Sequence, residues 1–274
     1  MKPGIYNGLS EAAYFADPAL SSTEARWLLE APAVYRWNKD HPRDDSTAAF
    51  DLGSAVHTKV LGTGWDVIEL DYPDWRSKQA QNARDEARAN GQIPMLAKDM
   101  RPVYAMAESV LAHPTARALF EADGTAEASV FSVDPLTGVS VKARFDRLNT
   151  HCAVDLKTTA GKASPDGFTK SVAGFGYHVQ EGHYIDAYAN ITGEMLPFKF
   201  VVVEKAPPYL VGVYELDEHF KEIGADAAKK ARELYAECLA SNEWPGYPEE
   251  VQQLAPPAWL AWAHEEEQAE IEIA

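Results

Sequence analysis

The segment from Arg144 to Thr159, RFDRLNTHCAVDLKTT, constrains the fold of this chain more than any other. Two stretches of alternating apolar and polar residues flank the polar turn LNTH, which predicts two neighbouring strands. Asp146 lies near the end of the first stretch, and Asp155 lies inside the second. Because side chains two residues apart on a strand point the same way, Lys157 shares the face of Asp155. The apolar residues that alternate with them then point to the opposite face and into a core.

Two carboxylates and one ammonium on a small polar patch suit a hard divalent cation with oxygen ligands. Such a cation beside a lysine can activate water for attack on a phosphodiester. An ordinary sheet surface is the alternative, with Asp155 paired to Lys157 and Arg144 beside Asp146. The motif Asp-X-Lys occurs by chance in many proteins, so the spacing alone leaves both interpretations open.

Length and composition bound the class of protein. A chain of 274 residues with 46% hydrophobic and 24% charged residues can bury a substantial core, as soluble globular proteins do. No apolar run approaches the roughly 20 residues that span a bilayer, and the first residues lack a secretory signal, so we expect a cytoplasmic protein without a membrane partner. The two cysteines, Cys152 and Cys238, can form neither a disulfide framework nor a four-cysteine iron–sulfur cluster.

The net charge of −17 argues against a general nucleic-acid coat protein, because phosphate binding normally needs a basic surface. It leaves room for a DNA enzyme with a local basic groove. Candidate cations for such a groove lie in the segment 76–88 and beside Asp146. Residues 265–274 hold five glutamates and no basic residue, so we expect a solvated, disordered tail or, as the alternative, a partner-binding tail.

The order of apolar patterns predicts an α/β domain with a mixed central sheet flanked by helices. We expect one domain over 1–264, with an N-terminal helical region over 1–62 and a helical spacer over 77–120. Other helices are expected after a cap at Ser21 or Ser22, and at 50–61, 166–192 and 217–241. Strands are expected at 65–70, 127–134, 139–148, 152–159, 199–204 and 210–216. The spacer should be interrupted at Asn90-Gly91 and at its three prolines.

Further candidate site residues lie outside the central segment. His57 follows the small residues of GSAVH, which would let its helix approach the sheet, although a lone helical histidine is more often a packed or surface residue. Glu127 opens a predicted strand, where it could equally face solvent. Gln180 and Tyr184 share one helix face at a spacing of four, and an aromatic stripe at that spacing is more often core packing.

Together these motifs resemble the RecE-type exonuclease VIII family. This family is a branch of the PD-(D/E)XK nucleases, related to the RecB nuclease domain and more distantly to λ exonuclease. The resemblance extends over residues 6–262 and includes Glu127. The matching segments are SSTEARWLLEAPAVYRW, FDLGSAVHTKVL, RFDRL, VDLKTT, QEGHY and WPGY…PPAW.

The resemblance implies a PD-(D/E)XK nuclease core and assigns roles to individual residues. The implied catalytic residues are Asp146, Asp155, Lys157 and Glu127. The implied ligands of Mg²⁺, for which Mn²⁺ would substitute, are His57, Asp146, Asp155 and the backbone carbonyl of Leu156. The implied substrate-binding residues are Gln180 and Tyr184, to which the sequence adds Arg144 and Arg147 beside the metal patch. No iron–sulfur cluster is expected.

The activity implied by the resemblance is Mg²⁺-dependent degradation of linear double-stranded DNA from 5′ ends. The remaining 3′ strands would serve recombination by strand annealing, in a phage or prophage system inside a bacterial host cell. Expected partners are DNA ends, a RecT-type single-strand annealing protein and further copies of the chain in a ring. The alternatives are a non-catalytic recombination protein that keeps the fold, and a CRISPR-adaptation or helicase-associated nuclease.

Overall fold

The structure is a computed structural model that describes residues 1–41, 48–262 and 264. Within these residues six strands form the central sheet, in the order β1-β4-β5-β6-β7-β8. Their bounds are β1 Gly4–Tyr6, β4 Gly124–Val133, β5 Ser140–Asn149, β6 Ala153–Thr159, β7 Phe198–Glu204 and β8 Val211–Tyr214. Strands β6 and β7 are parallel and the other neighbours are antiparallel. The predicted mixed central sheet is confirmed.

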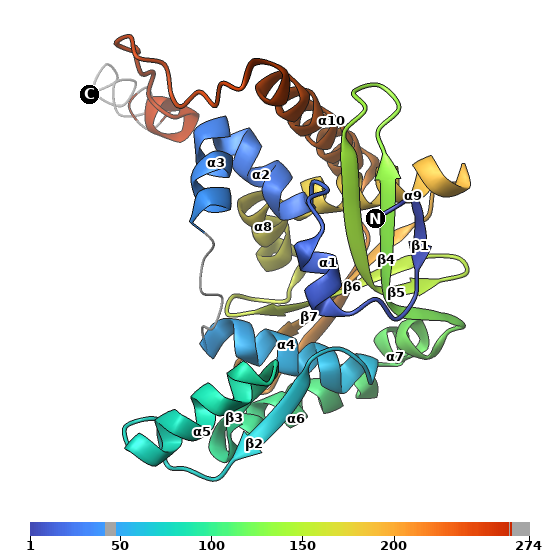
Figure 1. Cartoon of the computed structure of the whole chain (residues 1–274), viewed down its shortest axis with the longest axis vertical. Coiled ribbons are helices and arrows are strands. Elements are labelled where there is room, and N and C mark those ends of the chain that lie inside the picture. The colour runs from blue at the N-terminus through green and yellow to red at the C-terminus, as the bar shows by residue number, and fades with distance from the viewer. Residues whose placement is uncertain (42–47, 263, 265–274) are drawn as a thin grey trace, which may run out of the picture.

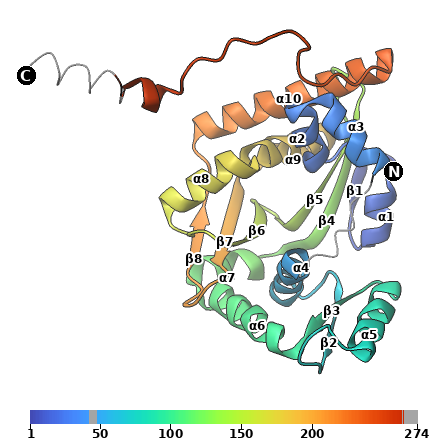
Figure 2. The same cartoon turned by 90° about the vertical axis from the view of Figure 1, so that its left-hand side faces the viewer.

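Helices cover both faces of the sheet (Figure 1; Figure 2). The layer on one face consists of α2 (Ser22–Glu30), α8 (Pro165–Phe175), α9 (Tyr177–Thr192) and α10 (Glu218–Ser241). The layer on the other face consists of α4 (Ala48–Leu61), α6 (Ala97–Ala112) and α7 (Pro114–Glu121). The remaining elements are α1 (Glu11–Ala16), α3 (Pro32–Asp40), α5 (Lys78–Ala89) and a parallel pair, β2 (Asp66–Leu70) and β3 (Gln92–Leu96).

Each face of the sheet has its own apolar core. Phe145 and Phe198 belong to the cluster under α8 and α9, whereas Val154 and Leu156 belong to the cluster under α4 and α6. Val154 and Leu156 are fully buried, and both lie on the face opposite Asp155 as the alternation predicts. The sheet therefore separates two packed layers, and residues of β6 contribute to both.

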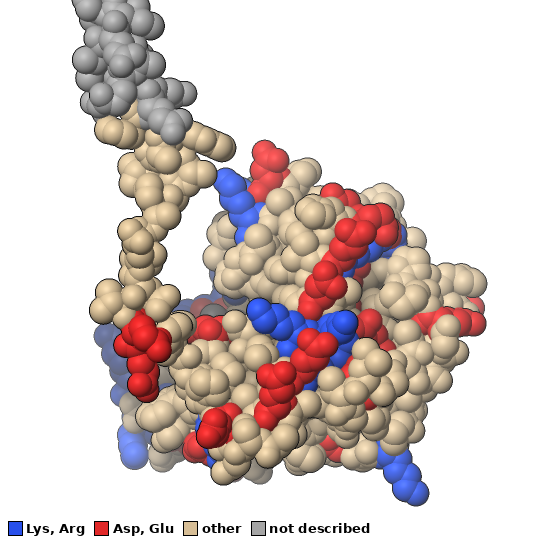
Figure 3. Space-filling view, turned by 90° about the horizontal axis from the view of Figure 1, so that it is seen from above, with Lys and Arg blue, Asp and Glu red and all other residues tan. Residues whose placement is uncertain are grey.

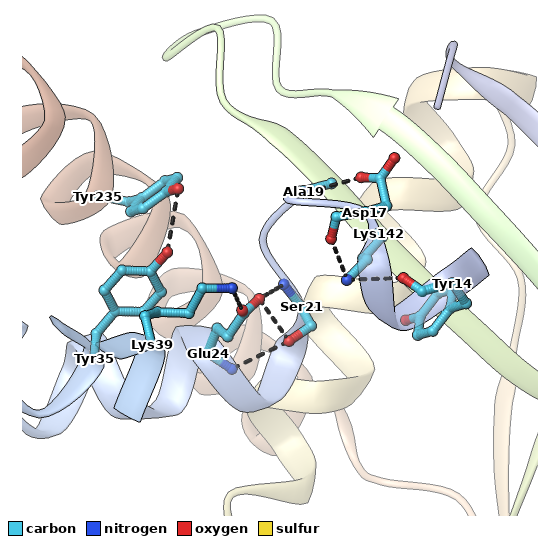
Figure 4. A network of polar contacts seen from close by, with 9 residues as sticks. All are labelled: Tyr14, Asp17, Ala19, Ser21, Glu24, Tyr35, Lys39, Lys142 and Tyr235. Carbon is cyan, nitrogen blue, oxygen red and sulfur yellow. Dashed lines mark hydrogen bonds and ion pairs between the residues drawn. The ribbon is translucent and has the colours of Figure 1, made fainter. Parts of the chain in front are cut away.

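The N-terminal helices are held on the sheet by local caps and buried charges (Figure 4). Ser21 caps α2: its hydroxyl accepts from the Glu24 amide at 3.3 Å, and the Glu24 carboxylate accepts from the Ser21 amide at 2.7 Å. Glu24 also pairs with Lys39 of α3 at 2.7 Å. On β5, the buried Lys142 ammonium donates to two backbone carbonyls at the end of α1, at 3.0 and 2.6 Å. These contacts hold the end of α1 against β5 and hold α3 against α2.

Most predicted elements have the expected type, but the prediction of a helical spacer over 77–120 was wrong in two respects. Residues Gln92–Leu96 form a strand, because the run that follows the turn at Gly91 pairs with β2 and buries its apolar side chains. Pro102 does not interrupt α6, which continues from Ala97 to Ala112. Periodicity alone cannot separate a short buried strand from part of a helix.

Two further elements differ from the sequence prediction. The expected helix over 166–192 is divided into α8 and α9 by Gly176, whose φ of 68° ends the first helix in a left-handed cap. The N-terminal residues Gly4–Tyr6 add strand β1 to the sheet edge by pairing with β4. The acidic tail 265–274 lies outside the described residues. No helix in the described ranges has the length and apolar character required to cross a membrane.

Candidate active site

The candidate site lies where strands β5 and β6 separate. In the described chain these strands pair at Arg147–Val154 and Leu148–Ala153, next to their connecting turn. Beyond this point the Asp146 carboxylate enters the gap, and its Oδ2 accepts from the Leu156 amide at 2.6 Å. A side-chain oxygen thus replaces a strand carbonyl as the acceptor. The fork brings Asp146 and Asp155 together from two strands, as the sequence predicts.

Strand β4 is irregular directly opposite the fork. Pairing with β5 holds on both sides of Glu127, which itself has a φ of 54°, a left-handed conformation uncommon for a residue with a side chain. On β5 the alternation also shifts, since Phe145 and Leu148 pack on the same cluster although they are three residues apart. Such a local distortion redirects side chains within a sheet. Here it lets Asp146 contact α4.

We call His57 and Asp146 the open half of the site. His57 Nε2 lies 3.1 Å from Asp146 Oδ2, and Nδ1 lies 2.9 Å from the carbonyl oxygen of Gly53, one turn earlier on α4. The small residues of GSAVH permit this approach, since Ala55 is fully buried. Burial is the largest single influence and opposes both charges, but the attraction between the two groups and their hydrogen bonds together outweigh it. These contacts raise the pKa of His57 to about 9 and lower the pKa of Asp146.

We call Asp155, Lys157 and Gln180 the closed half. Lys157 Nζ lies 2.6 Å from Asp155 Oδ2 and donates to Gln180 Oε1 at 2.9 Å, while Gln180 Nε2 donates to Asp155 Oδ1 at 2.6 Å. The ammonium also lies 4.7 Å from the centre of the Tyr177 ring. Burial raises the pKa of Asp155, even though Lys157 acts to lower it. Burial acts to lower the pKa of Lys157, but the charges of Asp155 and Asp146 raise it.

Glu127 and Arg144 border the open half. Burial and the nearby charge of Asp146 raise the pKa of Glu127 to about 8. Arg144 Nε lies 3.9 Å from Glu127, and Arg144 Nη1 lies 3.1 Å from Glu11 of α1. The guanidinium also stacks 4.4 Å above the Tyr14 ring. Arg144 therefore bridges two acidic side chains and holds α1 beside the site.

A groove of about 1350 Å³ passes over the open half. His57, Glu127 and Asp146 line it, together with residues of α1, α2 and the junction between α8 and α9. The three residues of the closed half are not part of its lining. A ligand in the groove would therefore meet the open half first.

Not every predicted residue joins this group. Tyr184 lines the groove, but its ring packs edge-on against Phe145. Arg147 is directed elsewhere, since it donates to the Ala122 carbonyl and to Asn149 Oδ1. The candidate cations of 76–88 have acidic neighbours: Arg76 pairs with Asp74, Arg84 with Asp85 and Arg88 with Asp51. Sequence reasoning missed Glu11, because it lies on a separate helix far away in the sequence.

The donor set fits a divalent cation, although the part of the chain that the structure describes contains no closed cluster of three His, Cys, Asp or Glu side chains. Carboxylate oxygens are suitable ligands for Mg²⁺ and Mn²⁺. The His57 imidazole can join them once the cation displaces its proton, since a metal ligand must be deprotonated. Asp155 Oδ2 is buried and, despite the nearby Lys157, accepts no hydrogen bond of good geometry. Buried oxygens normally have such a partner, so this oxygen retains capacity for another ligand. The Leu156 carbonyl stays a predicted ligand.

Residues 21–256 match the profile of a family described as a PDDEXK-like domain of unknown function (DUF3799). The chain belongs to this family. The match includes His57, Glu127 and Tyr184 as well as the fork, where Asp155-Leu156-Lys157 has the acid-X-Lys pattern of the family's description. The PD-(D/E)XK assignment is thereby confirmed, whereas the finer RecE-type assignment and the phage origin stay predictions.

A solved structure shares the fold of this PDDEXK-like domain. A protein from Eubacterium rectale described as "Putative exonuclease" aligns with a TM-score of 0.61 and 14% identity, over 91% of this chain and 95% of that chain. At this identity the similarity shows the fold alone. LHK-Exo in complex with dAMP aligns over 71% of this chain and 94% of its own, with 19% identity and a TM-score of 0.25, too low to support an argument. None of the curated proteins matches the chain. The family and the fold support a nuclease.

Proposed function

We propose that this PDDEXK-like domain is a metal-dependent exodeoxyribonuclease that degrades linear double-stranded DNA. The observation that carries the proposal is the fork of β5 and β6, where the open and closed halves meet beneath the groove. Hydrolysis of a phosphodiester needs a site for a cation, a fixed positive charge and access for an extended substrate. The fork and the groove carry groups suited to all three, which supports the proposal.

The protein residues would divide the work between them. His57, Asp146 and Asp155 would hold Mg²⁺ or Mn²⁺, which when bound supplies Lewis acidity and an activated water. Lys157, fixed between Asp155 and Gln180, presents a compact positive charge that can orient the water and stabilise charge on a phosphoryl oxygen. Asp146 keeps the strands apart by accepting from the Leu156 amide.

The polarity of degradation belongs to the same proposal and is supported by the resemblance of the ordered motifs. We propose attack from 5′ ends, which leaves 3′ single strands for annealing by a RecT-type partner. Since the chain carries a net charge of −17, a local patch in the groove must attract the DNA.

The test uses one linear duplex labelled separately at its 5′ and 3′ ends. With Mg²⁺ we expect loss of the 5′ label as nucleotides before loss of the 3′ label, and no loss with a chelator. A covalently closed circle of the same sequence is the matched substrate and should remain intact. The variant Asp155→Asn, which lacks one carboxylate of the site, is the matched control on the protein side. Binding without cleavage by the wild-type protein would favour the non-catalytic assembly role, and equal cleavage of circles would exclude an exonuclease.

A further inference from the structure

The chain ends in an extended segment that leaves the folded body. We define residues 245–262 as the C-terminal arm. The arm begins beside α3: the Trp244 ring stacks on Tyr35 at 5.1 Å between centroids, and the Ala33 amide donates to the Pro245 carbonyl at 3.1 Å. From this anchored root the arm runs away from the helices (Figure 2), and Figure 3 shows it standing clear of the surface.

The arm exposes apolar side chains at high density. The exposed fractions are Tyr247 76%, Val251 100%, Leu254 90%, Trp259 68%, Leu260 47% and Trp262 65%. Burial of large apolar side chains is stabilising, so leaving this set in water forfeits a large stabilisation. Dense exposed apolar groups mark interaction sites. Four prolines in the arm limit its freedom and so reduce the entropy lost on docking.

A small apolar pocket lies next to the root of the arm. Ala33, Val34, Trp37, Asn38 and His41 line this α3 pocket, which has a volume of about 340 Å³. The Trp37 ring stacks on the His41 ring at 3.8 Å and is 64% exposed. Aromatic walls suit an aromatic or aliphatic side chain from another segment. The arm of the same chain passes the pocket at its root without placing its tryptophans there.

We infer that the C-terminal arm of one copy docks in the α3 pocket of a second copy, and that the exchange is reciprocal. The root of the arm and the pocket are neighbours on one helix. A two-fold axis beside them would therefore carry each arm across the pocket of the other copy, which is the geometry of an isologous interface. The inference is independent of the proposed activity, and it places a two-fold pair where the resemblance implies a ring of copies.

The available area is sufficient for such an interface. Each arm offers Tyr247, Trp259 and Trp262, and an aromatic side chain buries about 150–250 Å². Because these rings are 65–76% exposed, two arms add about 600–1,000 Å² of newly buried aromatic surface. Together with the partner surface that the rings cover, the total comes near the range of about 1,200–2,000 Å² of a stable interface. The three exposed aliphatic side chains of each arm add to this area.

The first test is the mass of the full chain in solution, measured by sedimentation and light scattering. We expect twice the chain mass of 30.2 kDa. Trp259→Ser/Trp262→Ser removes the anchors of the arm, and Trp37→Gln removes a wall of the pocket. Each change should weaken association by about 10–100-fold, as loss of central aromatic contacts does. Leu136→Ser/Met195→Ser is the matched control, because these side chains are 76% and 68% exposed elsewhere and should leave the dimer intact.

The second test mixes the arm variant with the pocket variant. Either variant alone has no complete arm–pocket contact and should be monomeric. An equimolar mixture can form one such contact per pair, so heterodimers should reappear. A monomeric wild-type protein would overturn the inference, since the arm would then fold back or serve another partner. A dimer that survives both substitutions would also overturn it.

Discussion

The open and closed halves of the site lie on adjacent strands, but they differ in burial and in how their polar atoms are engaged. In the closed half Asp155 is 3% exposed, and its carboxylate is held by Lys157 and Gln180. In the open half His57 and Asp146 line the groove, where solvent and ligands have access. The closed half belongs to the layer of α9, and the open half belongs to the layer of α4.

This difference indicates a division of tasks. A buried, mutually bonded set fixes the position of an ammonium group, which is what preorganised charge stabilisation requires. A groove-facing carboxylate and imidazole can instead accept a cation and a substrate without unfolding the core. If the division is correct, substitutions in the two halves will reduce the activity equally but will reduce the stability of the fold unequally.

The largest expected effect is on activity. Asp146→Asn and Asp155→Asn should each reduce Mg²⁺-dependent cleavage by about 10³-fold or more, because loss of a cation site removes several kcal/mol of transition-state stabilisation. Initial rates on linear duplex measure the effect, and Asp166→Asn on the surface of α8 is the control. If one of the two variants retained its activity, the half of the site that it changes would be structural only.

The next effect is on stability and separates the two halves. Lys157→Met should destabilise the fold by about 3–5 kcal/mol, because it leaves Asp155 buried without its partner. His57→Gln should cost less, about 1.5–3 kcal/mol, the contribution of a hydrogen bond to a charged group in the half that stays open to the groove. Urea unfolding monitors both variants. Asp155→Asn/Lys157→Met is the control that should regain stability, and similar losses in the first two variants would contradict the division.

The stability of the fold should depend on pH through a histidine of α9, the helix that also carries Gln180 of the closed half. His183 of α9 is fully buried, with Nε2 3.1 Å from the Lys142 carbonyl oxygen, and burial lowers its pKa from 6.5 to about 4. Between pH 6.5 and about 4 the unfolded chain binds a proton that the folded chain does not. Stability should therefore fall by about 3 kcal/mol as the pH falls through this window.

The His183 contribution is isolated by comparing the wild-type protein with His183→Gln, whose stability should depend less on pH in that window. The comparison is necessary because Glu181 acts in the opposite sense. Burial raises the pKa of Glu181 from 4.5 to about 7, so its contribution to stability is lost as the pH rises. Parallel pH curves for the two proteins would show that folding does not lower the pKa of His183.

The smallest expected effect concerns the affinity for the cation. His57→Ala should weaken Mg²⁺ binding by about 10–100-fold, the usual loss when one contact of a metal site is removed. Calorimetric titration measures the affinity, and the rise in unfolding temperature with added Mg²⁺ gives a second readout. Affinity unchanged from that of the wild-type protein would remove His57 from the ligand set and leave it a structural partner of Asp146.

Sequence reasoning identified the parts of the fold that depend on neighbouring residues. Alternation within 144–159 predicted two strands, placed Lys157 on the face of Asp155 and sent Val154 and Leu156 into a core. A cap at Ser21 or Ser22 was predicted from residues within one turn of the helix, and the structure has it at Ser21. The motifs also gave the superfamily, because their order along the chain is specific even where each motif is weak.

Contacts between distant segments could not be obtained in this way. Only the tertiary structure showed that the strands separate at Asp146, that Arg147 is directed to Ala122, and that Glu11 approaches Arg144. It also replaced part of a predicted helical spacer by a strand and added β1 to the sheet.

The physical reason is the range of the forces involved. Periodicity, caps and turns are set by residues a few positions apart, so the sequence determined the element types and the face that carries Asp155 and Lys157. The direction of Asp146 and the partners of each charge depend on which helices pack on each face of the sheet. That packing is decided by burial summed over the whole chain, and only the folded structure expresses it.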